Sequence, residues 1–283
     1  MKIVKSIVYS VIIFSVWIGI SAFVTGNTVN GKMSSIDNCN MTNTSFQGGE
    51  RLVYKLYYNW KFVWIPAGEV VFTVQESNDT YTFKAVGNTY QSYESVFKVN
   101  DYFYSEVDKQ TLFPRNFVRI IEEGNYTLYD SIAFNQNNNK AVSYHGRTKE
   151  SAKYEEHKLN QCMQDLVSNM YYMRNFNTDG LKRGDQLRVK MFFDKQIFPI
   201  NVRYDGKEDK EVKGLGDFKA IKLIPDLVEG SVFKKGDHMT MWVSDDKNRI
   251  PLLIQSPVSV GSIKAVLKSY SGLKHNLEAQ IND

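Results

Sequence analysis

The sequence predicts a mostly β protein: a long, curved antiparallel sheet or open β-barrel, with one α-helix packed against it over about residues 160–175. Three observations support this prediction. Apolar and aromatic residues alternate with other residues over long stretches, which is the period of a β-strand. Turn residues separate these stretches at short intervals. A single segment has apolar residues at steps of three and four, which is the period of a helix.

The first 26 residues have the layout of a secretory signal peptide. Lys2 and Lys5 precede an apolar run over about residues 7–20, and cleavage after Ala22 or Gly26 fits the small residues that follow. An uncleaved anchor is the alternative, although the run is short for a span of about 20 residues. We therefore expect an exported protein of the periplasm or outer envelope of a Gram-negative bacterium. No stable transmembrane segment is expected after cleavage.

Charge and cysteine content restrict the partners of the mature chain. The formal net charge is +4, and loss of the two signal-peptide lysines lowers it to about +2, which does not favour nucleic acid. The two cysteines, Cys39 and Cys162, are expected to form a disulfide in an exported protein, with two separate thiols as the alternative. Cys39 lies too far beyond the apolar run for a lipid anchor, and the spacing of the pair fits no zinc motif.

The 283 residues suit one large β domain or two small ones, and we expect one. Residues 27–47 are rich in Asn, Ser and Thr and are expected to form a polar N-terminal arm. A single β-rich domain is expected over residues 48–272, with a strand meander at 50–147, the helix at 160–175 and strands at 186–270. The polar residues 273–283 are expected to form a frayed tail.

The first predicted strand carries an aromatic stripe. Its period-two positions are Leu52, Tyr54, Leu56, Tyr58, Trp60, Phe62 and Trp64. A turn is expected at residues 66–68, followed by a returning strand. The stripe has two interpretations. Aromatic residues at this period usually fill a core, but large aromatics also line ligand pockets in half-open β-barrels.

The predicted helix is based on seven apolar positions in the segment that follows the meander. They are Leu159, Cys162, Met163, Leu166, Val167, Met170 and Met173. The same helix carries Asp165, Ser168 and Arg174. These polar side chains either dock the helix on the strands or form a polar rim that recognises the head group of a ligand.

Residues 105–119 and 242–255 share one local pattern: strand, Asp-led turn, proline, strand. When Pro114 and Pro251 are aligned, Asp108 matches Asp245. An aspartate that opens a turn accepts hydrogen bonds from the backbone two residues further on, and a proline at a strand start removes no ladder donor. The adjacent carboxylates of Asp245 and Asp246 are therefore interpreted as a solvated hairpin tip, and a catalytic acid–base pair is disfavoured.

Three segments resemble one family of exported bacterial proteins. They are GERLVYKLYYNWKFVWIPAGEVVF at 49–72, CMQDLVSNMYYMRN at 162–175 and WVSDDKNRIPLLIQSPVSVGSIKAVLKSY at 242–270. Over most of residues 48–270 the chain resembles the domain of unknown function 3108, which implies no catalytic residue. A weaker, fold-level likeness points to the periplasmic lipoprotein carrier LolA, its receptor LolB and the RseB-type sensors. Those proteins fold as a curved sheet closed by helices over an apolar cavity.

The function favoured by these patterns is a binding or carrier module for a lipid-like or apolar ligand. The candidate ligand-binding residues are Tyr54, Tyr58, Trp60, Phe62, Trp64 and Arg174. The alternatives are an envelope structural or protein/glycan-interaction protein, and a hydrolase. The four histidines have no metal-ligand spacing, and the sequence has no nucleophile elbow, phosphate-binding loop or dinucleotide fingerprint. No cofactor, metal or enzymatic activity is therefore expected.

Overall fold

The computed structural model describes residues 33–34, 41–60, 63–95, 98–226, 238–257 and 261–281. The signal peptide, Cys39 and Phe62 lie outside these ranges, and the side chain of Trp60 is not described. The signal peptide and the disulfide therefore stay predictions.

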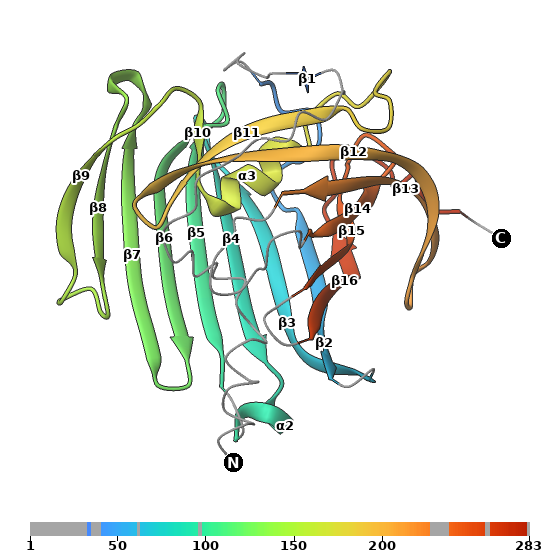
Figure 1. Ribbon diagram of the computed structural model, residues 1–283, viewed down its shortest axis with the longest axis horizontal. Helices are drawn as coiled ribbons and strands as arrows, with labels where there is room; N and C mark the ends of the chain where they lie inside the picture. The colour runs from blue at the N-terminus through green and yellow to red at the C-terminus, as the bar shows by residue number, and fades with distance from the viewer. Residues whose placement is uncertain are drawn as a thin grey trace.

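The strands of the described ranges form one open, curved sheet, as predicted (Figure 1). The first half contributes β1 (Met33–Ser34), β2 (Arg51–Trp60), β3 (Val63–Glu76), β4 (Thr80–Thr89), β5 (Asn100–Asp108), β6 (Pro114–Glu123), β7 (Tyr126–Asn135), β8 (Lys140–Gly146) and β9 (Lys153–Lys158). The second half contributes β10 (Met163–Gln164), β11 (Gln186–Phe193), β12 (Gln196–Val212), β13 (Gly216–Pro225), β14 (Thr240–Ser244), β15 (Pro251–Pro257) and β16 (Ser262–Ser271). Consecutive strands pair antiparallel from β2 to β9 and from β11 to β16, whereas β1 and β10 each pair parallel with β11.

The two halves of the chain share this sheet because β16 pairs antiparallel with β2. Ile263 lies opposite Tyr58, and Ala265 lies opposite Leu56. The strand order begins at β1 and ends at β9, so the sheet does not close into a barrel. It curves far enough that β11 and β12 pass over the concave face of the N-terminal strands, with α3 in between (Figure 1). This arrangement creates an interior without a closed barrel.

The helix packed in this interior, α3 (Leu166–Met173), is shorter than the predicted segment 160–175. Asp165 is its N-cap: one carboxylate oxygen accepts hydrogen bonds from the Val167 and Ser168 amides, while the Ser168 hydroxyl accepts one from the Asp165 amide. This capping box sets the first residue of the helix. Just before it, Met163 and Gln164 form β10, which pairs parallel with β11 and cannot be helical. The other short helices are α2 (Gln91–Glu94) and η1 (Gln136–Asn138).

Three strand boundaries differ from the expected ones. The chain reverses between Trp60 and Val63, so the turn expected at residues 66–68 is wrong, and these residues lie inside β3. β9 has no predicted counterpart, because it is an edge strand with mostly exposed side chains and so lacks alternation. The segments QIFPINVRYDG at 196–206 and DKEVKG at 209–214 are each expected to form a strand, but β12 is one strand of 17 residues that includes the first and part of the second. It has an irregularity near Gly206, whose φ of 101° favours glycine.

Both ends of the described chain pack against the sheet, which corrects the expected polar arm and frayed tail. Ser45 and Phe46 are buried, so the domain begins before residue 48. At the other end Ala279 is buried, and its carbonyl oxygen accepts a hydrogen bond from the Lys219 amide at 2.8 Å. A few apolar residues anchor each polar segment: Met41 packs against the same core cluster as Phe46 at one end, and Leu277 packs against the cluster of Ala279 at the other.

The two Asp-led turns have the predicted backbone role. One oxygen of Asp108 accepts hydrogen bonds from the amides of Gln110 and Thr111, at 2.9 and 3.0 Å. In the second turn Asp246 fills this role, with the Asn248 amide at 2.9 Å and the Arg249 amide at 3.2 Å. The counterpart of Asp108 is thus Asp246, and the expected match with Asp245 is wrong.

The second turn is also one residue longer than the first. The backbone hydrogen bond that closes the first turn joins the Asp108 amide to the Phe113 carbonyl, whereas the second joins the Ser244 amide to the Ile250 carbonyl. Asn248 within this turn is fully buried, so the tip is not solvated as expected. Its side chain bonds the backbone carbonyls of residues 275 and 276, which tie the C-terminal segment to the turn.

The core beneath α3 is centred on three aromatic rings. Tyr171 of α3 stacks on Phe83 of β4, with ring centroids 3.9 Å apart and planes 8° from parallel. Phe46 makes edge-on contacts with both rings, at 5.3 Å from Phe83 and 5.2 Å from Tyr171. Such pairs contribute about 0.5–1.5 kcal/mol beyond area burial. Helix, sheet and N-terminal segment therefore meet in one cluster.

Replacing Phe46 with Ala is expected to lower the free energy of unfolding by about 3–5 kcal/mol, because it leaves a cavity between two aromatic rings. Equilibrium urea denaturation measures this change. Val63→Ala is the control: Val63 is 61% exposed, so its loss should change the free energy of unfolding by less than about 0.5 kcal/mol. Equal effects of the two variants would contradict the assignment of residue 46 to the core.

Candidate functional site

A cavity of about 250 Å³ lies between the concave face of the sheet and α3. Its walls come from β2–β5, from α3 and from the second-half strands that curve back over the interior. Most of its lining is apolar, and the lining side chains include Leu56, Val70, Phe72, Met170, Met241 and Ile254. This volume is just below the range for small-molecule sites, about 300–1,000 Å³.

The cavity exists because the inward-facing side chains of β4 become smaller along the strand. Alternate residues of a strand share one face, so Tyr81, Phe83, Ala85 and Gly87 all face the interior. Phe83 reaches α3 and stacks on it, whereas Ala85 and Gly87 line the cavity. Protein interiors are normally close-packed, so two successive small residues opposite a helix leave space that a ligand can fill.

Methionine is frequent in the cavity wall. The methionines that line it are Met170, Met173, Met191, Met239 and Met241. Their unbranched, polarisable side chains adapt to irregular apolar shapes. Such a wall suits a flexible hydrocarbon better than a rigid polar molecule.

The aromatic stripe contributes little to this cavity. Tyr54 lines it and donates a hydrogen bond from its hydroxyl to the Pro251 carbonyl at 2.9 Å. Tyr58 is buried and Trp64 packs under the Lys264 ammonium at 4.2 Å, but neither lines the cavity. The stripe residues do not form one continuous row, because Trp64 belongs to β3, which follows the chain reversal after β2.

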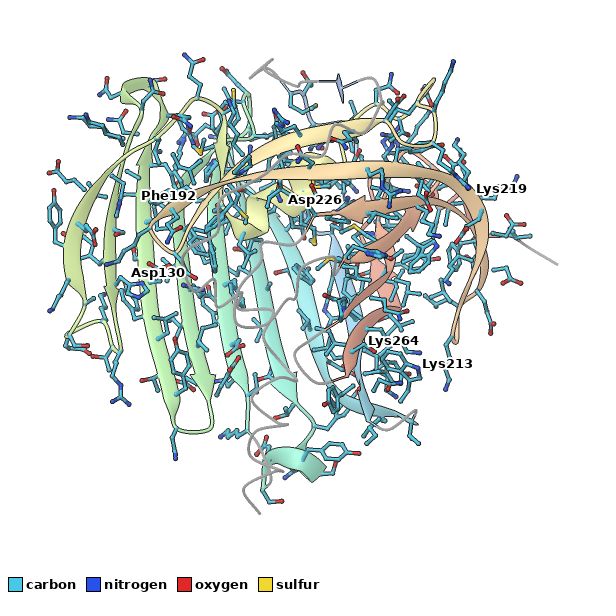
Figure 2. All side chains as sticks on the ribbon, in the orientation of Figure 1. Asp130, Phe192, Lys213, Lys219, Asp226 and Lys264 are labelled. Atoms are coloured by element: carbon cyan, nitrogen blue, oxygen red, sulfur yellow. The ribbon has the colours of Figure 1, made fainter. Side chains whose placement is uncertain are left out.

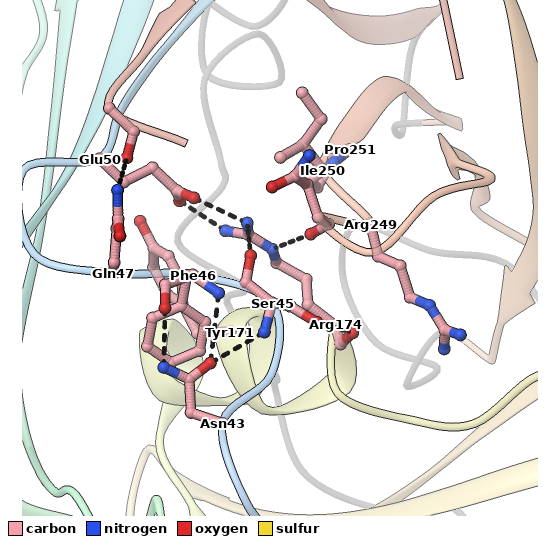
Figure 3. Close-up of polar contacts among 12 residues, drawn as sticks. Asn43, Ser45, Phe46, Gln47, Glu50, Tyr171, Arg174, Arg249, Ile250 and Pro251 are labelled. Atoms are coloured by element: carbon pink, nitrogen blue, oxygen red, sulfur yellow. Dashed lines mark hydrogen bonds and ion pairs between the residues drawn. The ribbon is translucent and has the colours of Figure 1, made fainter. Parts of the chain in front are cut away.

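Arg174, just after α3, is held in a buried network (Figure 3). Its guanidinium donates two hydrogen bonds to the Glu50 carboxylate, at 2.6 and 2.8 Å. It also donates to the carbonyl oxygens of Asn248 and Ser45, at 3.0 and 3.1 Å. Burial acts to lower the pKa of Arg174, but the Glu50 carboxylate outweighs it and raises the pKa. Although Arg174 borders the cavity, its donors are committed to protein groups.

Asp165 and Ser168 also serve helix docking. Besides the capping box, the Ser105 hydroxyl of β5 donates a hydrogen bond to the Asp165 carboxylate at 2.5 Å. Burial raises the pKa of Asp165 to about 6, although hydrogen bonds from Ser105 and the helix amides oppose the shift. Of the two interpretations of these polar helix residues, the contacts favour docking.

A second polar group lies away from the cavity, where the tip of the β11–β12 hairpin meets β6–β8. Asp130, labelled in Figure 2, shares the buried guanidinium of Arg119 with Asp194 from the hairpin tip. His145 Nδ1 lies 3.4 Å from an Asp130 oxygen. Asp130, His145 and Asp194 have ligand atoms within 4.8 Å of one another and could hold a metal ion. The Arg119 charge between the two carboxylates disfavours a cation there.

A serine–histidine contact is present on β8 and β9. Ser143 Oγ lies 2.8 Å from His157 Nε2, the distance of a nucleophile–base pair. The Ser143 side chain is buried, however, and neither residue lines the cavity. Burial lowers the pKa of His157, and its ring packs 5.0 Å from Phe192. The pair is therefore not positioned to reach a substrate in the cavity.

The cavity has one carboxyl group with an unusual protonation state. Asp101 on β5 lines the cavity and is buried. Desolvation raises its pKa to about 7, although the Glu122 amide, the Glu123 side chain and the Arg119 charge act in the opposite direction. Near neutral pH this group is therefore partly uncharged.

The family assignment follows from comparison with known proteins. The model of the family described as protein of unknown function (DUF3108) matches residues 53–268, which include β2–β16 except for the ends of β2 and β16. The chain belongs to this family. This matches the resemblance noted in the three segments and assigns no activity. No curated protein matches the sequence.

Solved structures provide a likeness of fold. A beta-barrel-like protein of domain of unknown function DUF1849 from Brucella abortus aligns with a TM-score of 0.50 at 11% identity, covering 78% of this chain and 96% of its own. A protein from Parabacteroides distasonis, provisionally described as a lipoprotein, aligns with a TM-score of 0.29 at 10% identity, covering 82% and 99%. The second alignment is too weak to support an argument. Within the described ranges no helix is long and apolar enough to cross a membrane.

Sequence reasoning missed most of the cavity wall, including Asp101, Arg249 and the methionines. The decrease in side-chain size from Phe83 to Gly87 along β4 is the local sequence pattern that indicates a cavity. No local pattern shows that Arg249 lies beside a cavity, because the cavity is formed by strands and a helix that are distant in the sequence.

Glu50→Gln is expected to lower the free energy of unfolding by about 3–5 kcal/mol, because Arg174 then stays buried without a compensating charge. Combining it with Arg174→Met should recover much of this loss. Glu76→Gln is the control: Glu76 pairs with Lys109 at 2.7 Å on the surface, where solvent screens the interaction, so little change is expected. Chemical denaturation distinguishes these outcomes, and a mild effect of Glu50→Gln would refute the role of the pair.

The raised pKa of Asp101 predicts a pH dependence of stability. Between its ordinary value of 3.8 and about 7, the folded protein keeps a proton that the unfolded chain releases. The contribution of Asp101 to the free energy of unfolding is therefore present at low pH and is lost as pH rises through this window. Asp101→Asn should reduce the pH dependence of the free energy of unfolding across this window, leaving the slope from Asp165 and Asp194, whose pKa values are also raised by burial. The exposed Asp217→Asn control should keep the original slope, and an unchanged slope in Asp101→Asn would refute the assignment.

Proposed function

We propose that this protein is a non-enzymatic binding or carrier module for a lipid-like or apolar ligand. The observation that supports this most directly is the apolar cavity of about 250 Å³ inside the curved sheet. Burial of apolar surface contributes roughly 25 cal/mol per Å², so a hydrocarbon that fills such a cavity gains most of its affinity without specific polar contacts.

The composition of the wall supports the same function. Methionine, aliphatic, aromatic and small side chains form most of it. The charged side chains among its described residues are Asp101, Arg174, Asp226 and Arg249. They do not form a nucleophile–base pair, and the Ser143–His157 pair lies elsewhere. A hydrolase that acts within the cavity is therefore the weaker alternative.

The place of action proposed here is the periplasm or outer envelope. It depends on the signal-peptide pattern of residues 1–26. A ligand-carrying domain in that compartment moves or presents molecules that water dissolves poorly.

An interaction protein is the second candidate function. Tyr144 and Tyr154, 47% and 55% exposed, pair edge-to-face at 5.6 Å where β8 meets the edge strand β9. Exposed aromatic side chains are frequent in protein interfaces. β9 also carries Lys153, Glu155 and Glu156, and charges on an edge strand discourage strand addition. The β8–β9 edge therefore supports an interaction function less strongly than the cavity supports ligand binding.

The experiment that tests ligand binding fills the cavity with two larger side chains. The double variant Met170→Trp and Met241→Trp is expected to weaken binding of a fluorescent long-chain fatty acid at least about tenfold, since the indoles occupy the ligand's space. Val63→Trp adds the same group at an exposed position and should bind as the original protein does. Thermal denaturation checks that each variant is folded.

Mass spectrometry of an organic extract gives an independent readout. Protein purified without detergent should release a stoichiometric lipid-like compound, and the cavity-filled variant should release none. Equal probe binding by the original and cavity-filled proteins would overturn the proposal and favour the interaction candidate.

A further inference from the structure

Arg249 lines the cavity, and its backbone is fixed in an unusual conformation. Its φ is 47°, in the left-handed region that residues other than glycine rarely adopt. The Asp246 carboxylate holds the Arg249 amide at 3.2 Å. Two residues further on, the Pro251 carbonyl accepts the Tyr54 hydroxyl. The position from which the side chain leaves the backbone is therefore restrained on both sides.

The repeated turn shows what this conformation does to a side chain. In the first turn the residue two before the proline is Leu112, with a φ of 57°, and its side chain is buried in the core. In the second turn the residue two before Pro251 is Arg249. In both turns a residue with positive φ thus precedes the proline by two positions, and its side chain faces the interior: a leucine in the core in one turn and an arginine at the cavity in the other.

The guanidinium of Arg249 lacks the partners that Arg174 has. Figure 3 shows it directed away from the Glu50–Arg174 network. Among the described residues no carboxylate lies within ion-pair distance of Arg249, although its side chain is half-buried. Burial lowers its pKa and nearby carboxylates oppose this, but an arginine stays charged at neutral pH.

The three nearby carboxylates are engaged elsewhere or exposed. Asp245 pairs with Lys207 at 2.8 Å. Asp246 accepts hydrogen bonds from the Ser244 hydroxyl and from turn amides. Asp179 is exposed to solvent, where screening weakens its field.

Among the described residues of the cavity wall, Arg249 is the positively charged side chain that no carboxylate neutralises. Glu50 neutralises Arg174, and Asp101 is partly protonated near neutral pH. Asp226 is exposed and accepts a hydrogen bond from the Asn201 amide group at 3.1 Å. A half-buried cation without a counter-ion is costly, and an anion bound beside it offsets that cost.

We propose that Arg249 binds the anionic head group of an amphiphile whose hydrocarbon chain occupies the cavity. The ligand class is a carboxylate or phosphate monoester with a single long chain. The planar guanidinium bonds two oxygens of such a head group at once. This inference rests on the proposed function and adds the identity of the head group.

The experiment compares dodecanoic acid with dodecanol, which has the same chain without the charge, by isothermal titration calorimetry. The original protein should bind the acid about tenfold or more tightly than the alcohol, the scale of a charge-assisted hydrogen bond. Arg249→Gln should weaken acid binding by a similar factor and leave alcohol binding unchanged. Arg249→Lys should retain part of the preference.

Arg147→Gln is the matched control, because it removes an exposed arginine outside the cavity and the same net charge. It should leave both affinities unchanged. Inorganic phosphate alone is a further probe, expected to bind at least tenfold more weakly than dodecyl phosphate. Thermal denaturation confirms that the variants are folded.

The possible failures are distinguishable. If the acid and alcohol bind equally and Arg249→Gln changes neither affinity, the head-group assignment is overturned while the cavity function stands. If neither binds the original protein, both proposals are overturned. If inorganic phosphate binds as tightly as dodecyl phosphate, Arg249 marks a site for free anions and the amphiphile assignment is wrong.

Discussion

The buried ion pair between Glu50 and Arg174 is the interaction on which the rest of the structure depends. Glu50 precedes β2 and Arg174 follows α3, while the Asn248 carbonyl that also binds the guanidinium belongs to the turn before β15. Three segments far apart in the chain thus meet at one side chain. This contact fixes α3 against the concave face while β16 closes onto β2, and so it determines where the cavity lies.

An interaction of this kind is costly unless every donor is satisfied, because two charges lose their hydration. Arg174 comes close to that condition, because each of its three guanidinium nitrogens has a hydrogen-bond acceptor. The guanidinium also lies 5.7 Å from the Phe46 ring and 5.3 Å from the Tyr171 ring, which adds cation–π attraction. Arg249 does not meet it within the described protein. The two arginines border the same cavity but differ in their partners: one is committed to the fold, and the other has donors available for a ligand.

Interactions between residues close in the sequence explain which parts of the fold the sequence predicted. Period-two patterns located most strands because each strand buries one face, and Asp108 and Asp246 produce similar turns because the capping depends only on neighbouring amides. The predictions failed where the burial of a residue depends on segments that are distant in the sequence. β9 lacks alternation at an exposed edge, and Phe46 is buried by distant strands. Met163 is apolar because it enters the core from β10, which pairs with β11, rather than because it is helical.

By itself, then, the sequence determined the family, the mostly β class, the Asp-led turns and the presence of one packed helix, since each depends on short-range patterns. It also named an arginine and an aromatic stripe as ligand contacts. Only the tertiary structure decided that Tyr54 and Leu56 are the described stripe residues that reach the cavity, that Glu50 neutralises Arg174, and that no carboxylate neutralises Arg249 among the described residues. These outcomes depend on which distant strands pair, because β16 must meet β2 before an interior, and a cavity within it, can form.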